Sequence, residues 1–235
     1  MPTVPAAAAI DRHPHLATPG AAGRLRVDMH SHTMWSGDST TMPEELATSI
    51  VESGIDVLCI TDHNAIAGAV ELVDRLPCRV VVGEELRTAA GEIIGLFLVE
   101  RVPSGLGHVE AAHAIREQGG LVYVPHPFDP MRRNLSEAAL YELAELGLID
   151  AVEVHNSKTS LASLNRRAVE FAAECDLAGG AGSDAHVPDA IGSAYVEIAD
   201  FTTAGEFLTA LRAGVVVGHH WDEPRPWSAR IVPSV

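Results

Sequence analysis

The chain repeatedly places imidazole and carboxylate side chains directly after apolar, strand-like stretches. In a His-x-His or Asp-x-His pair on an extended backbone, both side chains project to the same face, so the pair can chelate one ion. Imidazole mixed with carboxylate suits Zn²⁺, Mn²⁺ or Fe²⁺ better than Ca²⁺, and argues against a closed, cysteine-rich structural site. The pattern therefore predicts a dispersed, catalytic metal site. Its segments are VDMHSH (27–32), TDHN (61–64), VPHP (124–127) and GSDAH (182–186).

The elements that must position these segments alternate between strand-like and helix-like patterns. One helix is expected over residues 44–51, because Pro43 and two acidic residues begin it and Gly54 ends it. Repeated βα units imply a largely parallel sheet, and closure into a barrel brings the strand ends to one rim, where the chemistry lies. Further helices are predicted at 66–75, 107–118, 136–146, 160–175 and 203–213, and strands at 56–60, 79–82, 92–99, 121–124, 150–154, 177–181, 194–198 and 215–217.

Composition limits the class of protein. The 235 residues, 47% of them hydrophobic, predict one soluble barrel-sized domain. The formal net charge is −16 and the chain has no Lys/Arg-rich run, so long nucleic acid is not an expected partner. Three cysteines, an odd number without paired spacing, predict reduced structural thiols and a cytoplasmic location.

Both ends of the chain differ in composition from its middle. Residues 1–23 are rich in Ala and Pro and are expected to form a disordered lead-in. Their apolar run is too short to span a membrane, and Arg12 follows that run instead of preceding it as in a signal peptide. The barrel domain is expected over residues 24–218. Residues 219–235 contain three prolines and are expected to form an extended tail, and no membrane association is predicted.

Taken in order, these motifs closely resemble the PHP (polymerase and histidinol phosphatase) family of metal-dependent phosphoesterases. Each motif alone is weak, but together they follow the family's order from about residue 27 to residue 186. The resemblance implies a distorted (β/α)7 barrel holding two or three divalent ions. It is carried by His30-x-His32, Ser36-Gly37-Asp38, Pro43-Glu44-Glu45-Leu46, Thr61-Asp62-His63-Asn64, Gly83-Glu84-Glu85, Pro125-His126-Pro127, Glu153 with Asn156, and Gly182-Ser183-Asp184-Ala185-His186.

The resemblance also implies the ligands of each ion. Several relatives complete the third position with a histidine after the Gly-x-Glu motif, but this chain has none there. Glu92 is either its substitute or a solvated turn residue. One ion would be held by His30, His32, Glu84 and Asp184, a second by Asp38, His63 and His186, and a third by Glu84 and His126. Asp28 and Asp62 are interpreted as carboxylates that orient imidazoles, with direct ligation as the alternative.

Phosphate chemistry follows from such a site on physical grounds. Two ions roughly 3.5–4 Å apart can hold a hydroxide nucleophile and stabilise the attacked phosphorus centre, so no serine or cysteine nucleophile is needed. The leaving alkoxide would be protonated by a metal-bound water or by His155, which could instead line the pocket passively. Arg132, Arg133 and Lys158 follow strand ends and are candidates for binding phosphate oxygens, with a solvated loop as the alternative.

The predicted function is therefore metal-dependent hydrolysis of a small phosphate monoester through a metal-bound hydroxide. One alternative is an exonuclease or nucleotide phosphatase acting on short oligonucleotide or mononucleotide ends. The acidic composition and the few aromatic residues, three Trp, three Tyr and five Phe, favour the small substrate. Alternatives of another class are an amidohydrolase-like enzyme cleaving C–N or C–O bonds and a non-catalytic metal-binding module. The sequence does not predict an oligomeric state.

Overall fold

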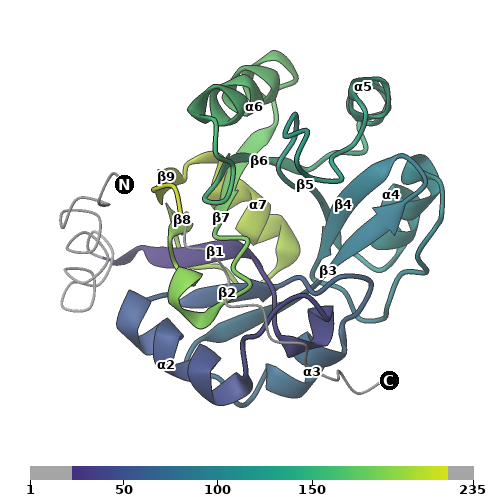
Figure 1. The fold of residues 1–235 in the computed structure, drawn as a ribbon. Coiled ribbons are helices and arrows are strands. Elements are labelled where there is room, and N and C mark those ends of the chain that lie inside the picture. Colours follow the sequence, from purple (N-terminus) through teal and green to yellow (C-terminus); the bar gives the residue numbers. More distant parts are fainter. Residues whose placement is uncertain (1–22, 222–235) are drawn as a thin grey trace.

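The strands form one curved sheet that almost closes on itself (Figure 1). The computed structural model describes residues 23–221. Residues 1–22 of the expected lead-in and residues 222–235 of the expected tail lie outside these. The nine strands are hydrogen-bonded in the order β7-β6-β5-β4-β3-β2-β1-β8-β9. Their bounds are β1 (Leu25–Ser31), β2 (Val57–Ile60), β3 (Arg79–Thr88), β4 (Gly91–Leu96), β5 (Leu121–Val124), β6 (Ala151–Asn156), β7 (Ala178–Gly182), β8 (Ala194–Ile198) and β9 (Val215–Gly218).

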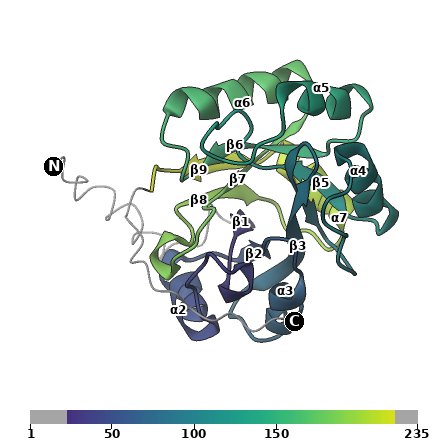
Figure 2. The ribbon, with the colours of Figure 1, turned by 45° about the vertical axis from the view of Figure 1, so that its right-hand side comes forward.

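The sheet closes where the end of β1 meets the segment after β7. Ser31 and Ala185 form a parallel bridge. The amide of His32 donates to the carbonyl of Ala185 at 2.9 Å, and the amide of Asp184 donates to the carbonyl of His30 at 2.8 Å. Figures 1 and 2 both show β1 and β7 side by side. The expected α/β barrel is thus confirmed, and its closure brings the first and last groups of predicted ligands together.

The sheet is less parallel than expected. The pairs β1–β2, β2–β3, β5–β6 and β6–β7 are parallel, whereas β4 runs antiparallel to both its neighbours. A tight turn at Thr88–Gly91 joins β3 to β4 directly, and Gly91 adopts a φ of 136°, which a side chain would strain. Because of this hairpin, β3 runs six residues past the expected end at Val82, so Glu84 and Glu85 lie within a strand.

Most of the helices cover the outside of the sheet (Figures 1 and 2). In α2 (Pro43–Ser53), Pro43 occupies the first turn and Gly54 ends the helix in the left-handed region at φ 68°, as expected. By contrast, α3 (Ala67–Leu72) is shorter than the expected helix over 66–75, since turns precede β3 and Pro77 cannot donate a helical hydrogen bond. The others are α4 (His108–Glu117), α5 (Glu137–Glu145), α6 (Ala162–Glu174), α7 (Ala204–Arg212) and the 3₁₀ turns η3 (Met34–Ser36) and η4 (Pro188–Ala190).

The barrel interior is apolar in its middle and polar at one rim. Met29, Cys59, Val81 and Tyr123 belong to a buried cluster of the inner strand faces, and Phe207 of α7 packs in the same cluster. The three cysteines are free thiols. Within residues 23–221 no helix has the length and apolar character needed to cross a membrane. The apolar middle leaves the strand ends as the place where buried polar groups gather.

Backbone crowding at this rim gives a first testable prediction. A Cβ on Gly182 would overlap the Cβ of His30 and lie 2.8 Å from both the His30 amide nitrogen and Oε1 of Glu153. We expect Gly182→Ala to destabilise the protein by about 3 kcal/mol, because the overlapping atoms belong to backbone and to well-packed buried side chains. Urea unfolding measures this change.

Gly205 provides the matched control for that substitution. It lies in the first turn of α7, and a Cβ there would meet nothing within 4 Å. Gly205→Ala is expected to leave the unfolding free energy unchanged or to raise it by up to about 1 kcal/mol. Equal unfolding midpoints for the two variants would contradict the tight packing between β7 and β1.

Candidate metal centre

The ends of β1 and β7 bring four of the predicted ligands into one cluster. Nε2 of His30 and Nε2 of His32 are 3.1 Å apart. Oδ1 of Asp184 lies 3.4 Å from His32 Nε2 and 3.3 Å from His186 Nδ1. His30, His32 and Asp184 are almost completely buried. The side chains of His30 and His32 and those of Asp184 and His186 therefore lie together, as their spacing of two residues predicts.

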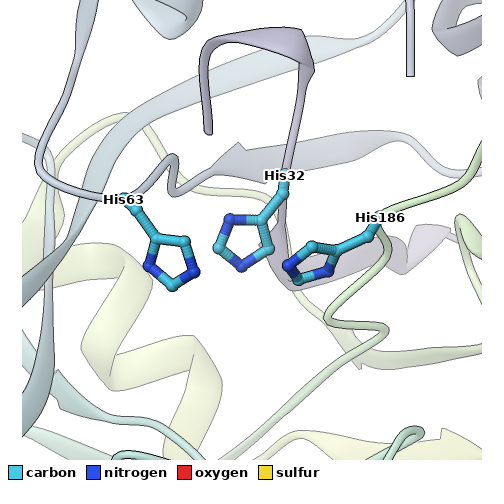
Figure 3. A group of neighbouring side chains, drawn as sticks. All are labelled: His32, His63 and His186. Atoms are coloured by element: carbon cyan, nitrogen blue, oxygen red, sulfur yellow. The ribbon is translucent and has the colours of Figure 1, made fainter. Parts of the chain in front are cut away.

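A second group lies on the more open side of His32. Figure 3 shows the rings of His63, His32 and His186 in a row with His32 in the middle. Its ring centroid is 4.7 Å from that of His63 and 4.2 Å from that of His186. Oδ2 of Asp38 lies 3.5 Å from His63 Nε2 and 3.3 Å from His186 Nε2. The three residues expected to hold the second ion are thus neighbours.

Glu85, and not Glu84, is the carboxylate at the centre of the cluster. Its Oε2 lies 3.5, 3.4 and 3.0 Å from ring nitrogens of His30, His32 and His63. Its Oε1 lies 3.0 Å from Nε2 of His126. Neighbouring residues of a strand point to opposite faces, so only one of the two adjacent glutamates can face the barrel interior. The ligand set expected from the sequence is corrected at this position.

Glu84 is buried on the other side of β3, outside the cluster. Its Oε2 accepts a hydrogen bond from the amide of Val102 at 2.9 Å, and its Oε1 is buried without a hydrogen-bond partner among the described residues. Burial raises the pKa of Glu84 to about 7. Glu84 therefore lies away from the imidazoles, on the face of β3 opposite to that of Glu85.

Hydrogen bonds on the outer ring nitrogens orient His30 and His32. Nδ1 of His30 lies 3.1 Å from Oε1 of Glu153, and Nδ1 of His32 lies 2.8 Å from Oγ of Ser36. The Ser36 hydroxyl donates to Asp62 at 2.9 Å, so it accepts from the imidazole. These contacts place a ring proton on Nδ1 of both histidines, so Nε2, which faces the cluster, is the nitrogen that would be available to a metal ion.

The two aspartates predicted to orient imidazoles behave differently. Asp62 acts through Ser36, as described, and also accepts two hydrogen bonds of 2.7 Å from Thr33. Asp28 instead binds backbone: it accepts from the amides of His30, Ser183 and Gly192. Asp28 therefore fixes the junction between β1 and the segment after β7, and it contacts no imidazole through a hydrogen bond.

Burial and neighbouring charges shift the pKa values of two histidines of the cluster in opposite directions. Burial by itself lowers the pKa of His30, but Glu153, Asp184 and Glu85 together raise it well above the usual range. Burial, followed in size by the charge of neighbouring His186, holds the pKa of His32 well below its usual range, so the His32 ring is neutral. A proton on His30 and the nearby cations Arg132 and Lys158 partly offset the three buried carboxylates, and a divalent cation placed among them would take the place of that proton.

Backbone strain marks two of the predicted ligands. His126 and Asp184 have φ values of 29° and 49°, in the left-handed region that residues other than glycine rarely adopt. Such conformations cost on the order of 1–3 kcal/mol each and persist where the surrounding structure enforces them. At His126 the turn directs Nε2 towards Glu85 and leaves a buried Nδ1 without a hydrogen bond among the described residues.

These donors fit divalent metal ions. Buried nitrogens with inward lone pairs, 3.1 Å apart, repel each other unless a proton or a cation lies between them. Imidazole and carboxylate donors match Mn²⁺, Fe²⁺ and Zn²⁺. Within residues 23–221, four groups offer three ligand atoms within 4.8 Å of one another: His32, His63 and His186; His30, His32 and Glu85; His30, His126 and Asp184; and His63, Glu85 and Glu92.

Glu92 lies within the structured rim instead of in a solvated turn. It is 4% exposed, and its Oε1 is 3.9 Å from His63 Nδ1. The same oxygen lies 3.2 Å from Nε of Arg87, its cross-strand partner on β3. Glu92 is therefore available to a third ion beside His63 and Glu85.

Three cations border the small pocket that opens onto the cluster. The pocket has a volume of about 140 Å³, and its walls include Arg87, Arg132 and Arg133. Nη2 of Arg132 lies 3.2 Å from Oδ2 of Asp184. Nζ of Lys158 lies 3.6 Å from Oδ1 of Asp184 and 2.8 Å from His186 Nδ1. Arg132 and Lys158 thus both contact Asp184.

His155 is not among the residues that form this pocket. Its ring packs against Gly218 of β9, where an added Cβ would come within 2.7 Å of two of its ring atoms. Burial lowers the pKa of His155. The bulge in β6 between Glu153 and His155 directs Glu153 into the cluster and leaves His155 beside the end of β9. Its expected role as a proton donor is not supported by this position.

Comparisons with known proteins agree with this geometry. A family model described as the PHP domain matches residues 28–116, and one described as PHP-associated matches residues 162–216. An uncharacterized protein of Methanocaldococcus jannaschii is 38% identical over 197 residues, which cover 80% of this chain and 79% of that protein. The chain belongs to the PHP family.

Two solved structures show the same fold. One is a two-domain protein from Bacteroides vulgatus containing a predicted PHP-like metal-dependent phosphoesterase, with a TM-score of 0.66 and 18% identity. The match covers 83% of this chain and 65% of that protein. The other is PsfC from Pseudomonas syringae, with a TM-score of 0.64, 19% identity, and coverage of 83% and 92% of the two chains. The PHP fold is thus shared although most residues differ.

Sequence reasoning missed three residues of this PHP site. Glu85 lies within the Gly83-Glu84-Glu85 motif, and only the alternation of side chains along a longer β3 separates it from Glu84. Glu153 was recognised as part of the motif order, but nothing in the sequence showed that its carboxylate meets the ring of His30. Arg87 borders the pocket only because the β3–β4 hairpin turns back over the rim, and no local signal indicates this.

Proposed function

We propose that this PHP-family protein hydrolyses a small phosphate monoester in a reaction that depends on divalent metal ions. The observation that carries the proposal is the meeting of Arg132 and Lys158 at Asp184, inside the cluster of imidazoles. Positive side chains beside metal ligands provide what a phosphate dianion needs, namely charge and directed donors on the oxygens that face away from the ions.

The residues present define where ions would be held. His30, His32, Glu85 and Asp184 suit one ion, and Asp38, His63 and His186 suit a second. Glu92 and His126 flank Glu85 on either side and suit a third. Ions bound there supply charge stabilisation for the attacked phosphoryl group and lower the pKa of the attacking water.

In this proposal, each side chain around the ions has its own role in binding the phosphate or in orienting a histidine. Arg132 can exchange its contact with Asp184 for a phosphoryl oxygen, since its guanidinium already lies on the pocket wall. Lys158 lies on the other side of Asp184 and can hold a second oxygen. Glu153 and the Ser36–Asp62 pair keep a proton on Nδ1 of His30 and His32, so that Nε2 is the nitrogen that would bind an ion. The small volume of the pocket favours a terminal phosphate over an internal diester.

A substrate panel tests the proposal. With Mn²⁺ present and salt held fixed, we expect kcat/KM for compact phosphate monoesters, such as sugar or amino-alcohol phosphates and mononucleotides, to exceed that for short oligonucleotides by about tenfold or more. Phosphate release measured for all substrates at equal ionic strength gives the comparison. If oligonucleotides are cleaved tenfold faster, an end-directed nuclease replaces this proposal, and hydrolysis of amides alone would place the activity in another class.

A further inference from the structure

Lys158 is the only lysine in this chain of 235 residues, and every other permanently charged basic side chain is an arginine. Its ammonium group lies at the metal centre, with Nζ 2.8 Å from Nδ1 of His186 and 3.6 Å from Oδ1 of Asp184. The side chain is 15% exposed. Lysine carries a compact charge on a flexible four-carbon stem, so the backbone around Lys158 decides where that charge lies.

The inner side of the loop that carries Lys158 is fixed by Asn156, the last residue of β6. Oδ1 of Asn156 accepts from the Lys158 amide at 2.8 Å, and Nδ2 of Asn156 donates to Oε2 of Glu153 at 2.9 Å. The amide of Ser157 donates to the carbonyl of Gly182 on β7 at 3.2 Å. These bonds tie the loop to the metal centre, and they do not involve the carbonyl of Ser157, which leads into Lys158.

The β9 extension, residues 219–221, supplies two donors to that carbonyl. Nδ1 of His220 and the backbone amide of Trp221 each lie 2.8 Å from the carbonyl oxygen of Ser157. A carbonyl oxygen only accepts, so the His220 ring carries a proton on Nδ1. Figure 2 shows β9 beside β6, the strand that leads into the loop. The peptide group that joins Ser157 to Lys158 is thus held from the outer side as well.

The β9 extension is itself anchored on the barrel. The amide of His219 donates to the carbonyl of Ser193 at 3.0 Å, which continues the pairing of β9 with β8. The side chain of Trp221 is partly buried and packs against the apolar cluster that contains Ile50 of α2. Because the extension is fixed before and after His220, its hydrogen bonds to the Ser157 carbonyl restrict the movement of the loop.

We propose that His220 is a positioning residue of the phosphate site, which acts through the Ser157 carbonyl to hold Lys158 at Asp184 and His186. The role of Lys158 in binding phosphate rests on the proposed function, and the inference adds the residue that fixes its place. Because the loop is held from both sides, it is ordered when the protein folds and not when substrate binds, which favours binding. Without the His220 donor, the loop loses one of its two outer hydrogen bonds and phosphate binding weakens.

Kinetics of His220 variants test this role. We expect His220→Ala to raise KM for a compact phosphate monoester about fivefold and to change kcat by less than about twofold, because binding is lost and the metal ligands stay in place. His220 is exposed, so the substitution leaves no cavity in the core. His220→Asn, whose side-chain NH₂ can replace Nδ1 as the donor, should recover most of the loss.

A double-mutant cycle shows whether His220 acts through Lys158. In a Lys158→Ala protein, His220→Ala should change KM by less than about 1.5-fold, because the residue that it positions is gone. His108→Ala is the matched control: it removes an imidazole that lies 2.8 Å from Glu142 between α4 and α5, and it should leave KM unchanged. Independent, multiplying effects of Lys158→Ala and His220→Ala would contradict the positioning role.

Chemical labelling of Lys158 provides a measurement without turnover. Because the chain has one lysine, an amine-reactive ester modifies chiefly Lys158 and the N-terminal amine, and mass spectrometry separates the two. At fixed pH, we expect the labelling rate of Lys158 to rise about fivefold in His220→Ala and to stay within about twofold of wild type in His220→Asn and His108→Ala. Urea unfolding checks that each variant is folded.

The two measurements separate this inference from the proposed function. A protein that hydrolyses phosphate monoesters, with KM and labelling rate unchanged in His220→Ala, overturns the positioning role and keeps the proposed function. A protein that hydrolyses no phosphate ester, yet shows faster labelling of Lys158 in His220→Ala, overturns the proposed function alone, since His220 still holds the lysine in place.

Discussion

Chelation of divalent metal is expected to lower kcat/KM for a phosphate monoester by at least about 10³-fold, because bound ions contribute several kcal/mol of charge stabilisation in the transition state. Prolonged dialysis against a chelator, removal of the chelator, and an assay with an aryl phosphate measure the loss. Repletion with Mn²⁺, Zn²⁺ or Fe²⁺ should restore activity, since the donors are imidazoles and carboxylates.

Calcium serves as the matched control for repletion. Ca²⁺ prefers six to eight oxygen ligands, and the cluster offers imidazole nitrogen at most of its positions, so Ca²⁺ should restore little activity. Elemental analysis confirms that the dialysed sample is free of metal. Undiminished hydrolysis in such a sample would exclude the proposed chemistry.

Replacing glutamate by glutamine at positions 85 and 84 should affect metal binding and activity very differently. We expect Glu85→Gln to remove most of the bound metal and to lower kcat/KM by about 10³-fold, because Glu85 faces four imidazoles and its charge balances the ions. Glu84→Gln should retain metal and change kcat/KM by no more than about threefold, because Glu84 contacts the amide of Val102.

The pair is informative because both changes have the same size and lie in the same strand. Metal content by mass spectrometry and kcat/KM, measured on the same preparations, separate loss of ligation from loss of folding. A Glu84→Gln protein that loses as much metal as Glu85→Gln would restore the ligand set expected from the sequence and contradict the orientation of β3.

Much of the fold was predictable because its local signals agree with its global arrangement. Pro43 and Gly54 mark the ends of α2 where the structure has them, and the other predicted helices and strands lie within a few residues of their observed positions, except that β3 extends six residues further. The direction of β4 was not predictable in the same way. A tight hairpin after β3 makes β4 antiparallel, whereas a helical crossover would make it parallel, and the choice depends on long-range pairing that no short segment encodes.

The sequence predicts which residues gather at the candidate site better than it predicts how their side chains are oriented. His30, His32, Asp38, His63, His126, Asp184 and His186 lie together as expected, and their role as metal ligands stays a prediction. The choice between Glu84 and Glu85 depended on whether β3 ended at Val82 or continued, a matter of tertiary pairing. His155 is the histidine that the sequence offers at the rim as a proton donor, and the bulge in β6 turns it away from the cluster.

The bridge between Ser31 and Ala185 also has a consequence for how the protein is made. The residues that converge on one ion come from both ends of the domain, since His30 and His32 are synthesised early and Asp184 and His186 more than 150 residues later. The proposed ligand set of the first ion is therefore complete only after Asp184 has been synthesised, although His30, His32 and Glu85 are present earlier. We expect chains truncated before Asp184 to bind metal more weakly than the full domain.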